Sequence, residues 1–360
     1  MKNESDKPKS DGTPNPASIS RRKRRPLRAV LIVVGAICLL AAATGAYFGF
    51  KAFKQFSGPA HTIIIPKGAD EAAIRKILTD QLGDYGSDVA MFWSMRSGSP
   101  AKAAGRFTVQ PGDRVWSVVN RLRAGAQTPV DVKFNQVRTL SELASKVSRD
   151  MAFGPDEFIA ACHNVLSPMG YPELMFPAAF IPDTYNFYYS TDPNEVVRRL
   201  VAHRDKFWNT SRRKKAKTLG LSPEDVTIIA SIVEEETNRK DEMPLVARLY
   251  INRLDKGMKL EADPTVKFAI GDFSIKRIKG SMLDVKSAYN TYRVEGLPPG
   301  PIRIPEASTI DAVLNAPEHD YIFMCASVDR PGYHDFTADY KEHQANGRRY
   351  REWLDSQGIN

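Results

Sequence analysis

The sequence ASIVEEET, residues Ala230 to Thr237, ends an apolar helix in three consecutive glutamates. Apolar residues between Val226 and Val233 recur at helical spacing, and at about 100° per residue Glu236 falls in the middle of their face. Burial on that face disfavours the charged form of a carboxyl group and raises its pKa, as a general acid near neutral pH requires. Glu236 is therefore the candidate catalytic residue.

Two other interpretations of these residues remain open. Three glutamates at a helix end are often only a solvated charge run, because ionised side chains are rarely buried. Glu234 falls toward the Ala230 side of the helix and is the second candidate for the acid, while Glu235 flanks the apolar stripe. Residues outside this stretch are needed to decide among them.

The net charge of +9 is concentrated at the N-terminus. Residues 1–28 hold nine Lys or Arg against three acidic residues, which leaves 42 basic and 39 acidic residues for the rest of the chain. No basic surface of the kind that binds nucleic acid is therefore expected in the body of the protein. The first 28 residues contain few large apolar side chains and are predicted to form a disordered cytoplasmic tail.

Residues 29–50 form a run of 22 residues without a charge. As a helix this run spans about 33 Å, enough to cross a bilayer core. The Lys and Arg cluster before it predicts a single-pass anchor in the cell (inner) membrane, with a cytoplasmic N-terminus and a periplasmic or extracytoplasmic body. A cleavable signal peptide is the alternative, although the run exceeds the usual signal core of about 7–15 residues.

A strand-turn-helix pattern recurs after the apolar run, at residues 61–82, at residues 105–125 and, more loosely, at residues 130–151. In the second copy Pro111 and Gly112 form the turn, and Asp113 is expected to cap the helix. Its sequence FTVQPGDRVW resembles the opening of a LysM module, which implies binding to N-acetylglucosamine-containing glycans. An ordinary piece of core architecture would give the same pattern.

Further along the chain, turns and helix ends divide the sequence. Residues 180–187 (FIPDTYNF) are interpreted as an aromatic turn and residues 211–217 (SRRKKAK) as a basic linker. Ser222 is the predicted cap of the glutamate-bearing helix, with Pro223 in its first turn. Residues 258–266 are expected to run extended into a turn at Asp263. Residues 287–301 contain too much Pro and Gly for regular structure and are expected to form a loop beside a cleft.

The three cysteines give no sign of a metal centre or a disulfide framework. Cys38 lies in the apolar run, and Cys162 and Cys325 lie in segments assigned to different domains. Neither has a neighbouring Cys or His at metal-ligand spacing, apart from the adjacent His163. Two packed thiols, and no metal or cofactor, are therefore expected.

Several separated motifs together resemble the MltG (YceG-like) family of membrane-anchored endolytic murein transglycosylases. They are ASIVEEET, NRLDKGMKLEADPTV, SAYNTY, GLPPGPI, a closing HDF segment at residues 334–336, and the PDTY of FIPDTYNF. The resemblance implies an α+β fold with a single N-terminal transmembrane helix, a LysM-like strand-turn-helix region and a lysozyme-like transglycosylase catalytic domain. The corresponding boundaries are a tail (1–28), an anchor (29–50), a LysM-like region (51–128), an intermediate mixed α/β region (129–218) and the catalytic domain (219–360).

The resemblance also assigns roles to particular residues. In the family motif written VEKET the second glutamate is catalytic, and it aligns with Glu236; Glu234 aligns with the first. Glu235 stands where Lys is usual, and its negative charge is expected to raise the proton affinity of Glu236 further. Glu261 and Ala262 replace a glutamine-bearing segment, which puts a direct substrate role for position 261 in doubt.

Substrate contacts are predicted in two motifs. From SAYNTY they are Tyr289, Asn290 and Thr291, since aromatic faces suit sugar rings and amides suit acetamido groups. From the ADPTV segment they are Asp263 and Thr265. A structural role is the alternative for each of these side chains. His334 is expected to be a structural partner and not a catalyst.

The implied reaction is cleavage of the bond between N-acetylmuramic acid (MurNAc) and N-acetylglucosamine (GlcNAc) in nascent strands. It would leave 1,6-anhydro-MurNAc ends and so limit strand length. A hydrolytic muramidase is one alternative, which would need a second carboxylate near Glu236, for which Asp263 is the candidate. A noncatalytic, membrane-anchored glycan-binding scaffold is the other. The expected partners are glycan strands and the membrane, with wall synthases or divisome and elongasome proteins as further candidates, and no nucleic acid.

Overall fold

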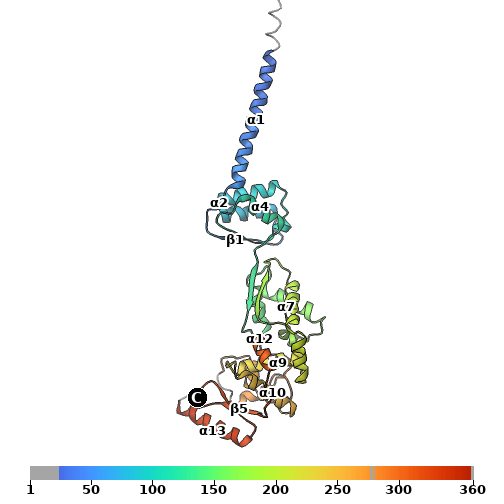
Figure 1. Cartoon of the computed structure of the whole chain (residues 1–360), viewed down its shortest axis with the longest axis vertical. Helices are drawn as coiled ribbons and strands as arrows, with labels where there is room; N and C mark the ends of the chain where they lie inside the picture. Colours follow the sequence, from blue (N-terminus) through green and yellow to red (C-terminus); the bar gives the residue numbers. More distant parts are fainter. Residues whose placement is uncertain (1–23, 276–277, 279, 358–360) are drawn as a thin grey trace, which may run out of the picture. The chain divides into compact units, whose positions relative to one another are not determined.

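The computed structural model describes residues 24–275, 278 and 280–357. The chain divides into two compact units, Met1–Ala126 and Gln127–Asn360 (Figure 1). Within the described part the strands form three separate two-stranded antiparallel sheets, and helices make up most of the remaining regular structure. The predicted α+β class is therefore confirmed. The predicted cytoplasmic tail lies mostly outside the described residues.

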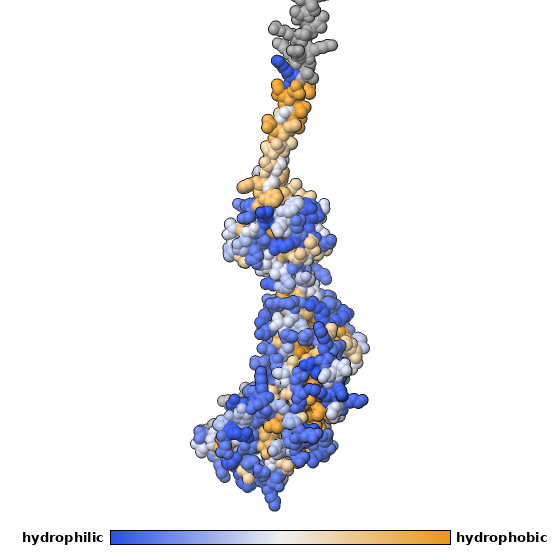
Figure 2. Space-filling model, in the orientation of Figure 1, coloured by the Kyte–Doolittle hydropathy of each residue, from blue (hydrophilic) through white to orange (hydrophobic). Residues whose placement is uncertain are grey.

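Helix α1 (Arg24–Phe53) contains the apolar run. Its segment Arg28–Phe53 is long and apolar enough to cross a membrane, with a mean hydropathy of 2.5 in its most apolar window, and none of that window is buried in the protein. Figure 2 shows apolar side chains covering this helix, whereas the visible surfaces of both units are mostly hydrophilic. At the end of α1, Lys51 and Lys54 form ion pairs with the buried carboxylate of Asp88.

The first unit pairs β1 (His61–Ile65) antiparallel with β2 (Gly105–Val109). Its helices are α2 (Glu71–Met95), α3 (Pro100–Ala103) and α4 (Val115–Ala124). Both predicted strand-turn-helix copies are present here. Helix α2 runs beyond its expected end at Leu82 because Gly83 takes a positive φ of 60° and lets the chain bend and resume a helical path.

Asp113 does not cap α4, contrary to the expectation. Arg114 occupies the cap position, and its side chain makes no capping hydrogen bond. The Asp113 carboxylate instead accepts from the backbone N–H of Gln110 and pairs with Arg121 at 2.5 Å. The aspartate thus closes the turn in front of the helix, which is another common use of this side chain.

The second unit begins with β3 (Val130–Phe134), which pairs antiparallel with β4 (Asp183–Phe187). Between and after them come α5 (Leu140–Ser148), α6 (Pro155–Leu166), the 3₁₀ helix η2 (Glu173–Ala179) and α7 (Pro193–Phe207). Residues 183–187 form a strand and not the predicted aromatic turn. Tyr185 and Phe187 alternate inward, and the Tyr185 ring stacks on Phe134 at 5.6 Å between centroids.

The predicted basic linker is wrong as well, since residues Thr210–Thr218 form helix α8. The Asn209 side chain caps it by accepting from the N–H of Arg212, and Ala216 is buried beneath it. Arg212 also pairs with Asp311 at 2.8 Å. Lys and Arg are good helix formers, so a local cap and one tertiary ion pair are sufficient to order this cationic segment.

Helix α9 (Pro223–Glu236) lies at the centre of the remaining elements. These are α10 (Met243–Asp255), α11 (Asp263–Ile270), η3 (Gly280–Asp284), α12 (Ala307–Leu314), the antiparallel pair β5 (Phe323–Ala326) and β6 (His334–Thr337), and α13 (Tyr340–Ser356). Ser222 caps α9 as predicted, in a capping box with Asp225. Every residue of α9 from Val226 to Val233 is buried, because α10, α11 and α12 all pack against it.

Of two segments near α9 that were predicted to be irregular, one is helical and the other is a loop. The segment at Asp263 begins helix α11 and is not a turn, since Pro264 is tolerated in the first turn of a helix. The loop at residues 287–301 contains no helix or strand, as predicted. At its end Gly300 packs so closely that an added Cβ would lie 2.0 Å from the backbone oxygen of Leu174, so no larger residue fits there.

Candidate active site

A cleft opens on both sides of Glu236, at the C-terminal end of α9. One part has a volume of about 590 Å³ and is also lined by Tyr250, Asp263 and Tyr292. The other, of about 480 Å³, extends past Asn238. Glu236 lines both parts, together with Ala326, His334 and Tyr350, so the two parts adjoin at these residues.

Among the described residues, one donor forms a hydrogen bond with the half-buried Glu236 side chain. The Tyr250 hydroxyl donates to Glu236 Oε1 at 2.6 Å. Burial raises the pKa of Glu236, and the charge of Asp263 adds to that rise. The Tyr250 hydrogen bond and the electrostatic interaction with His334 lower the pKa and so oppose the rise. The pKa remains above its ordinary value, so the group can carry a proton at a higher pH than an exposed glutamate.

Replacing Tyr250 with Phe should remove this hydrogen bond and change the pH dependence of kcat/KM. Tyr250 stabilises the carboxylate, so its loss should raise the pKa of Glu236 further. A protonated acid would then persist to higher pH, and the alkaline limb of kcat/KM should move upward. The acid would also be weaker, and kcat should fall by about tenfold. Profiles of strand cutting for wild type and Tyr250→Phe measure both effects; an unmoved alkaline limb would contradict the assignment.

His334 is held beside Glu236 by a buried carboxylate. Glu242 is only 3% exposed, and it accepts from the backbone N–H of His334 at 2.6 Å and pairs with its Nδ1 at 3.0 Å. This matches the prediction that His334 is a structural partner. His334 also lines both parts of the cleft, which the sequence analysis did not predict.

Asp263 and Tyr292 form another part of the wall of the larger part of the cleft. The Tyr292 hydroxyl donates to Asp263 Oδ1 at 2.7 Å, and burial raises the pKa of Tyr292. The structure thus brings the predicted site residue Asp263 into one cavity with Glu236. Its charge is near enough to affect the pKa of Glu236.

The other predicted contact residues lie behind this wall. Asn290, Thr291 and Thr265 are fully buried. The Asn290 amide donates to the backbone oxygens of Leu283 and Val285, and the hydroxyls of the two threonines lie 2.8 Å apart. These three side chains are therefore inaccessible to a sugar.

Tyr289 is half-buried and packs against Phe268, with 4.7 Å between the ring centroids. It does not line either part of the cleft described above. We therefore assign Tyr289, Asn290, Thr291 and Thr265 to the support of the loop that carries Tyr292.

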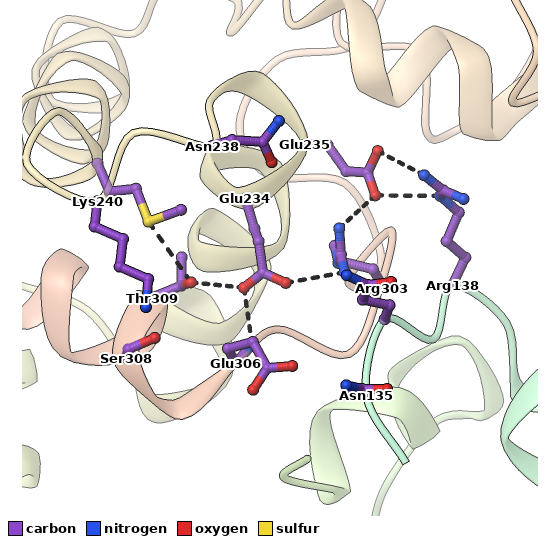
Figure 3. Close-up of a pocket in the computed structure, with 12 residues that line it drawn as sticks. Asn135, Arg138, Glu234, Glu235, Asn238, Lys240, Arg303, Glu306, Ser308 and Thr309 are labelled. Carbon is purple, nitrogen blue, oxygen red and sulfur yellow. Dashed lines mark hydrogen bonds and ion pairs between the residues drawn. The ribbon is translucent and has the colours of Figure 1, made fainter. Parts of the chain in front are cut away.

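Glu234 and Glu235 face a second cavity, which is separate from the cleft (Figure 3). Glu234 accepts from the N–H of Glu306 at 2.8 Å and from the Thr309 hydroxyl at 2.6 Å, and it pairs with Arg303. The Glu234 side chain is only 9% exposed, so the alternative interpretation of these glutamates as a solvated charge run is wrong for this helix end. Glu234 lines neither part of the cleft, which favours Glu236 as the acid.

Glu235 pairs with both Arg138 and Arg303. Two cations therefore compensate the charge that was expected to act on Glu236. The additional negative charge that raises the pKa of Glu236 comes from Asp263.

Two further cleft residues were not identified as site residues from the sequence. Arg253, which is 5% exposed, pairs with Glu261 at 2.5 Å, and both line the larger part of the cleft. Glu261 has a positive φ of 53°, an uncommon backbone conformation for a residue other than glycine. Position 261 thus belongs to the cleft wall. Among the described residues, no three His, Cys, Asp or Glu side chains are grouped as a metal site.

Cys162 and Asn252 line neither part of the cleft, whereas Cys325 lines its larger part. Cys162 is buried, Cys325 is half-buried, and both are free thiols. Asn252 donates to the backbone oxygens of His319 and Tyr321, and so braces α10 against the segment between α12 and β5.

The fold and the site together define an α+β protein with an N-terminal apolar helix and a cleft that contains Glu236, a glutamate with a raised pKa. The sequence model described as the YceG-like family matches residues 63–349, which is well over half of the chain. The chain therefore belongs to the YceG-like family, and the resemblance drawn from its motifs is confirmed.

Curated relatives and a solved structure agree with this membership. A Bacillus subtilis (strain 168) protein named endolytic murein transglycosylase is 25% identical over 317 residues, covering 80% of this chain and 84% of that protein. A Streptococcus pneumoniae (D39) protein of the same name is 27% identical over 155 residues, which is 41% of this chain and 27% of that protein. A yceG-like protein from Listeria monocytogenes has a similar fold, with a TM-score of 0.52 and 23% identity over 79% of this chain and 98% of that one.

Proposed function

We propose that this chain is an endolytic murein transglycosylase with Glu236 as its acid and base. The observation that carries the proposal is the raised pKa of Glu236 at the junction of two cavities. The name shared by the Bacillus and Streptococcus relatives supports the same reaction. The substrate is a glycan strand of alternating MurNAc and GlcNAc.

The first step is protonation of the glycosidic oxygen. Glu236 gives its proton to the oxygen between MurNAc and GlcNAc, the bond to the MurNAc anomeric carbon breaks, and GlcNAc leaves with a new hydroxyl. A raised pKa keeps the proton on Glu236 until this step. Tyr250 then stabilises the carboxylate that remains, because its hydroxyl donates to Oε1.

The second step closes a ring within the same sugar. The Glu236 carboxylate takes the proton from the 6-hydroxyl of MurNAc, and the oxygen attacks the anomeric carbon to form the 1,6-anhydro bond. Glu236 ends the cycle protonated, and no water is consumed. Since both reacting atoms belong to one sugar, the attack is effectively unimolecular, which can lower the barrier by about 7–11 kcal/mol at best.

Cutting within a strand requires room for sugars on both sides of the broken bond. The cleft extends in two directions from Glu236, toward Tyr292 on one side and toward Asn238 on the other. Such a cleft supports endolytic cutting, which would limit the length of nascent strands.

A hydrolytic muramidase is the second candidate, and Asp263 is the observation that favours it. A hydrolase needs a second carboxylate to activate water or to attack the sugar. Asp263 lines the same part of the cleft as Glu236 and accepts a hydrogen bond from Tyr292. In the transglycosylase this carboxylate would instead stabilise the positive charge that develops on the sugar.

The finer architecture belongs to the same proposal. We assign residues 51–128 to a LysM-like region, 129–218 to an intermediate region and 219–360 to a lysozyme-like catalytic domain. The pairing of β1 with β2 supports the first of these. In that region Arg96 lies 4.2 Å over the ring of Trp116, so a glycan would compete with a cation for this aromatic face.

The proposed topology follows from α1 and the cations before it. The helix spans the cell membrane with the N-terminus in the cytoplasm, and the cleft lies on the extracytoplasmic side with the nascent strands. Wall synthases and divisome or elongasome proteins are the partners that this location favours.

Mass spectrometry of the products tests the reaction. The full chain in detergent is incubated with purified glycan strands, in parallel with Asp263→Asn. We expect internal cuts that end in anhydro-MurNAc with both proteins, at a lower rate for the variant. Reducing ends from wild type that disappear in Asp263→Asn would assign a hydrolase. Retained glycan binding without any cutting would favour a noncatalytic scaffold.

A further inference from the structure

A second cavity lies on the opposite side of α9 from the cleft. It has a volume of about 690 Å³ and is defined here as the Arg303 pocket by six of its lining residues, Gln136, Asn238, Lys240, Arg303, Glu306 and Thr309. Two residues along a helix are turned by about 200°, so Glu234 faces this pocket while Glu236 faces the cleft. Asn238 lines both cavities, so the pocket and the cleft adjoin at this residue.

The charges of the pocket are only partly paired. Glu234 and Glu235 are compensated by Arg138 and Arg303 (Figure 3). Lys240 and Glu306 also line the pocket, but no described residue forms an ion pair or hydrogen bond with their terminal charged groups. One cation and one anion thus remain open to a ligand.

Arg303, which lines the pocket, also carries a donor without a protein partner in the described part of the chain. The residue is 8% exposed, and its Nε is a buried donor without a hydrogen-bond partner in the described part of the chain. Buried donors are nearly always paired, because leaving one unpaired is costly. Such a donor at the pocket is available to a polar ligand or to water.

The chemistry of the lining selects the class of ligand. Asn135, Gln136 and Asn238 add amides to the free cation and anion, and Met243 is the one large apolar side chain among the described lining residues. A lipid or a sugar ring needs an apolar or aromatic face, whereas a peptide with a free carboxylate and a free amine needs these charges and amides.

We propose that the Arg303 pocket binds the peptide substituent of the murein strand, with Lys240 taking a carboxylate and Glu306 taking an amine. This inference rests on the proposed function, because murein carries such a peptide on its muramic acid. A five-residue peptide extends up to about 17 Å, enough to turn out of the cleft around Asn238. The enzyme would then prefer strands that still carry their peptides.

Cutting assays on two substrates test the preference. The full chain in detergent is given strands with intact peptides and strands from which an amidase has removed them, and the ratio of the two cutting rates is measured. Lys240→Ala and Glu306→Gln should each lower this ratio by about tenfold, the size expected for one charge-assisted contact. Lys217→Ala, an exposed lysine on α8, should keep the wild-type ratio. A ratio that is the same in all four proteins would overturn the proposal.

A binding measurement separates this inference from the proposed function. A synthetic stem pentapeptide with a diamino acid and a free C-terminus is titrated into the full-length wild type and into Lys240→Ala. Binding by wild type that weakens about tenfold in the variant supports the pocket, even if no strand is cut. Absence of binding by wild type overturns the pocket, and leaves the cutting results to decide the reaction.

Discussion

Glu236→Gln should reduce the rate of strand cutting by about 10²–10⁴-fold, the usual contribution of a general acid and base. Glutamine keeps the size of the side chain and can still accept from the Tyr250 hydroxyl, but it has no acidic proton to give to the glycosidic oxygen. The loss should therefore appear in kcat, with KM nearly unchanged. Rates of appearance of new strand ends, measured by mass spectrometry, give both constants.

Glu234→Gln is the matched control, since it makes the same change two residues away on the same helix. Glu234 is engaged by Arg303 and Thr309 outside the cleft, so this variant should retain most of its kcat. A large loss of kcat in Glu234→Gln with little loss in Glu236→Gln would transfer the role of the acid. Equal losses in both variants would mean that the helix end has rearranged, which circular dichroism would reveal.

The two glutamates also show what the sequence could and could not predict about this site. Helical periodicity placed Glu236 on an apolar face, and Ser222 and Pro223 gave the start of the helix correctly. Periodicity describes one face only, whereas α9 is buried all round between Val226 and Val233. The helices that bury it, α10, α11 and α12, lie outside these eight residues, which is why the eight residues alone also fit a solvated charge run.

Long-range contacts account for the other differences. The partners of Glu235 are Arg138, 97 residues before it, and Arg303, 68 residues after it. No local pattern links these positions. Asn290 illustrates the same limit, because its amide could serve an acetamido group or a backbone oxygen equally well, and only its full burial shows that it serves the backbone.

Local patterns predicted elements best where an apolar run ended in a turn that contains Pro and Gly. The strands at residues 61–65 and 105–109 were of this kind. The strand Asp183–Phe187 was missed because Pro182 and two aromatic residues resemble a turn, and its pairing with β3 across about 50 residues is not visible locally.

Arg303→Gln should destabilise the region around α9 by about 2–4 kcal/mol. The guanidinium is 10% exposed and pairs with the Glu234 and Glu235 carboxylates, which are 9% and 18% exposed. Its removal leaves Glu234 without a cation and Glu235 with Arg138 alone. An unpaired buried carboxylate destabilises the fold by more than the original ion pair stabilises it, because no cation compensates its desolvation. Hydrogen exchange of the amides between Val226 and Val233 measures the free energy of opening.

Arg212→Gln provides the comparison, since Arg212 also pairs with a carboxylate through two nitrogens, at Asp311. That pair is more solvated, with 27% and 39% of the two side chains exposed, so its loss should cost about 1 kcal/mol or less. If burial is the cause of the difference, adding Glu234→Gln to Arg303→Gln should recover part of the stability, because the double variant no longer buries that charge. Equal effects of Arg303→Gln and Arg212→Gln, or no recovery in the double variant, would show that the carboxylates find solvent when the arginine is lost.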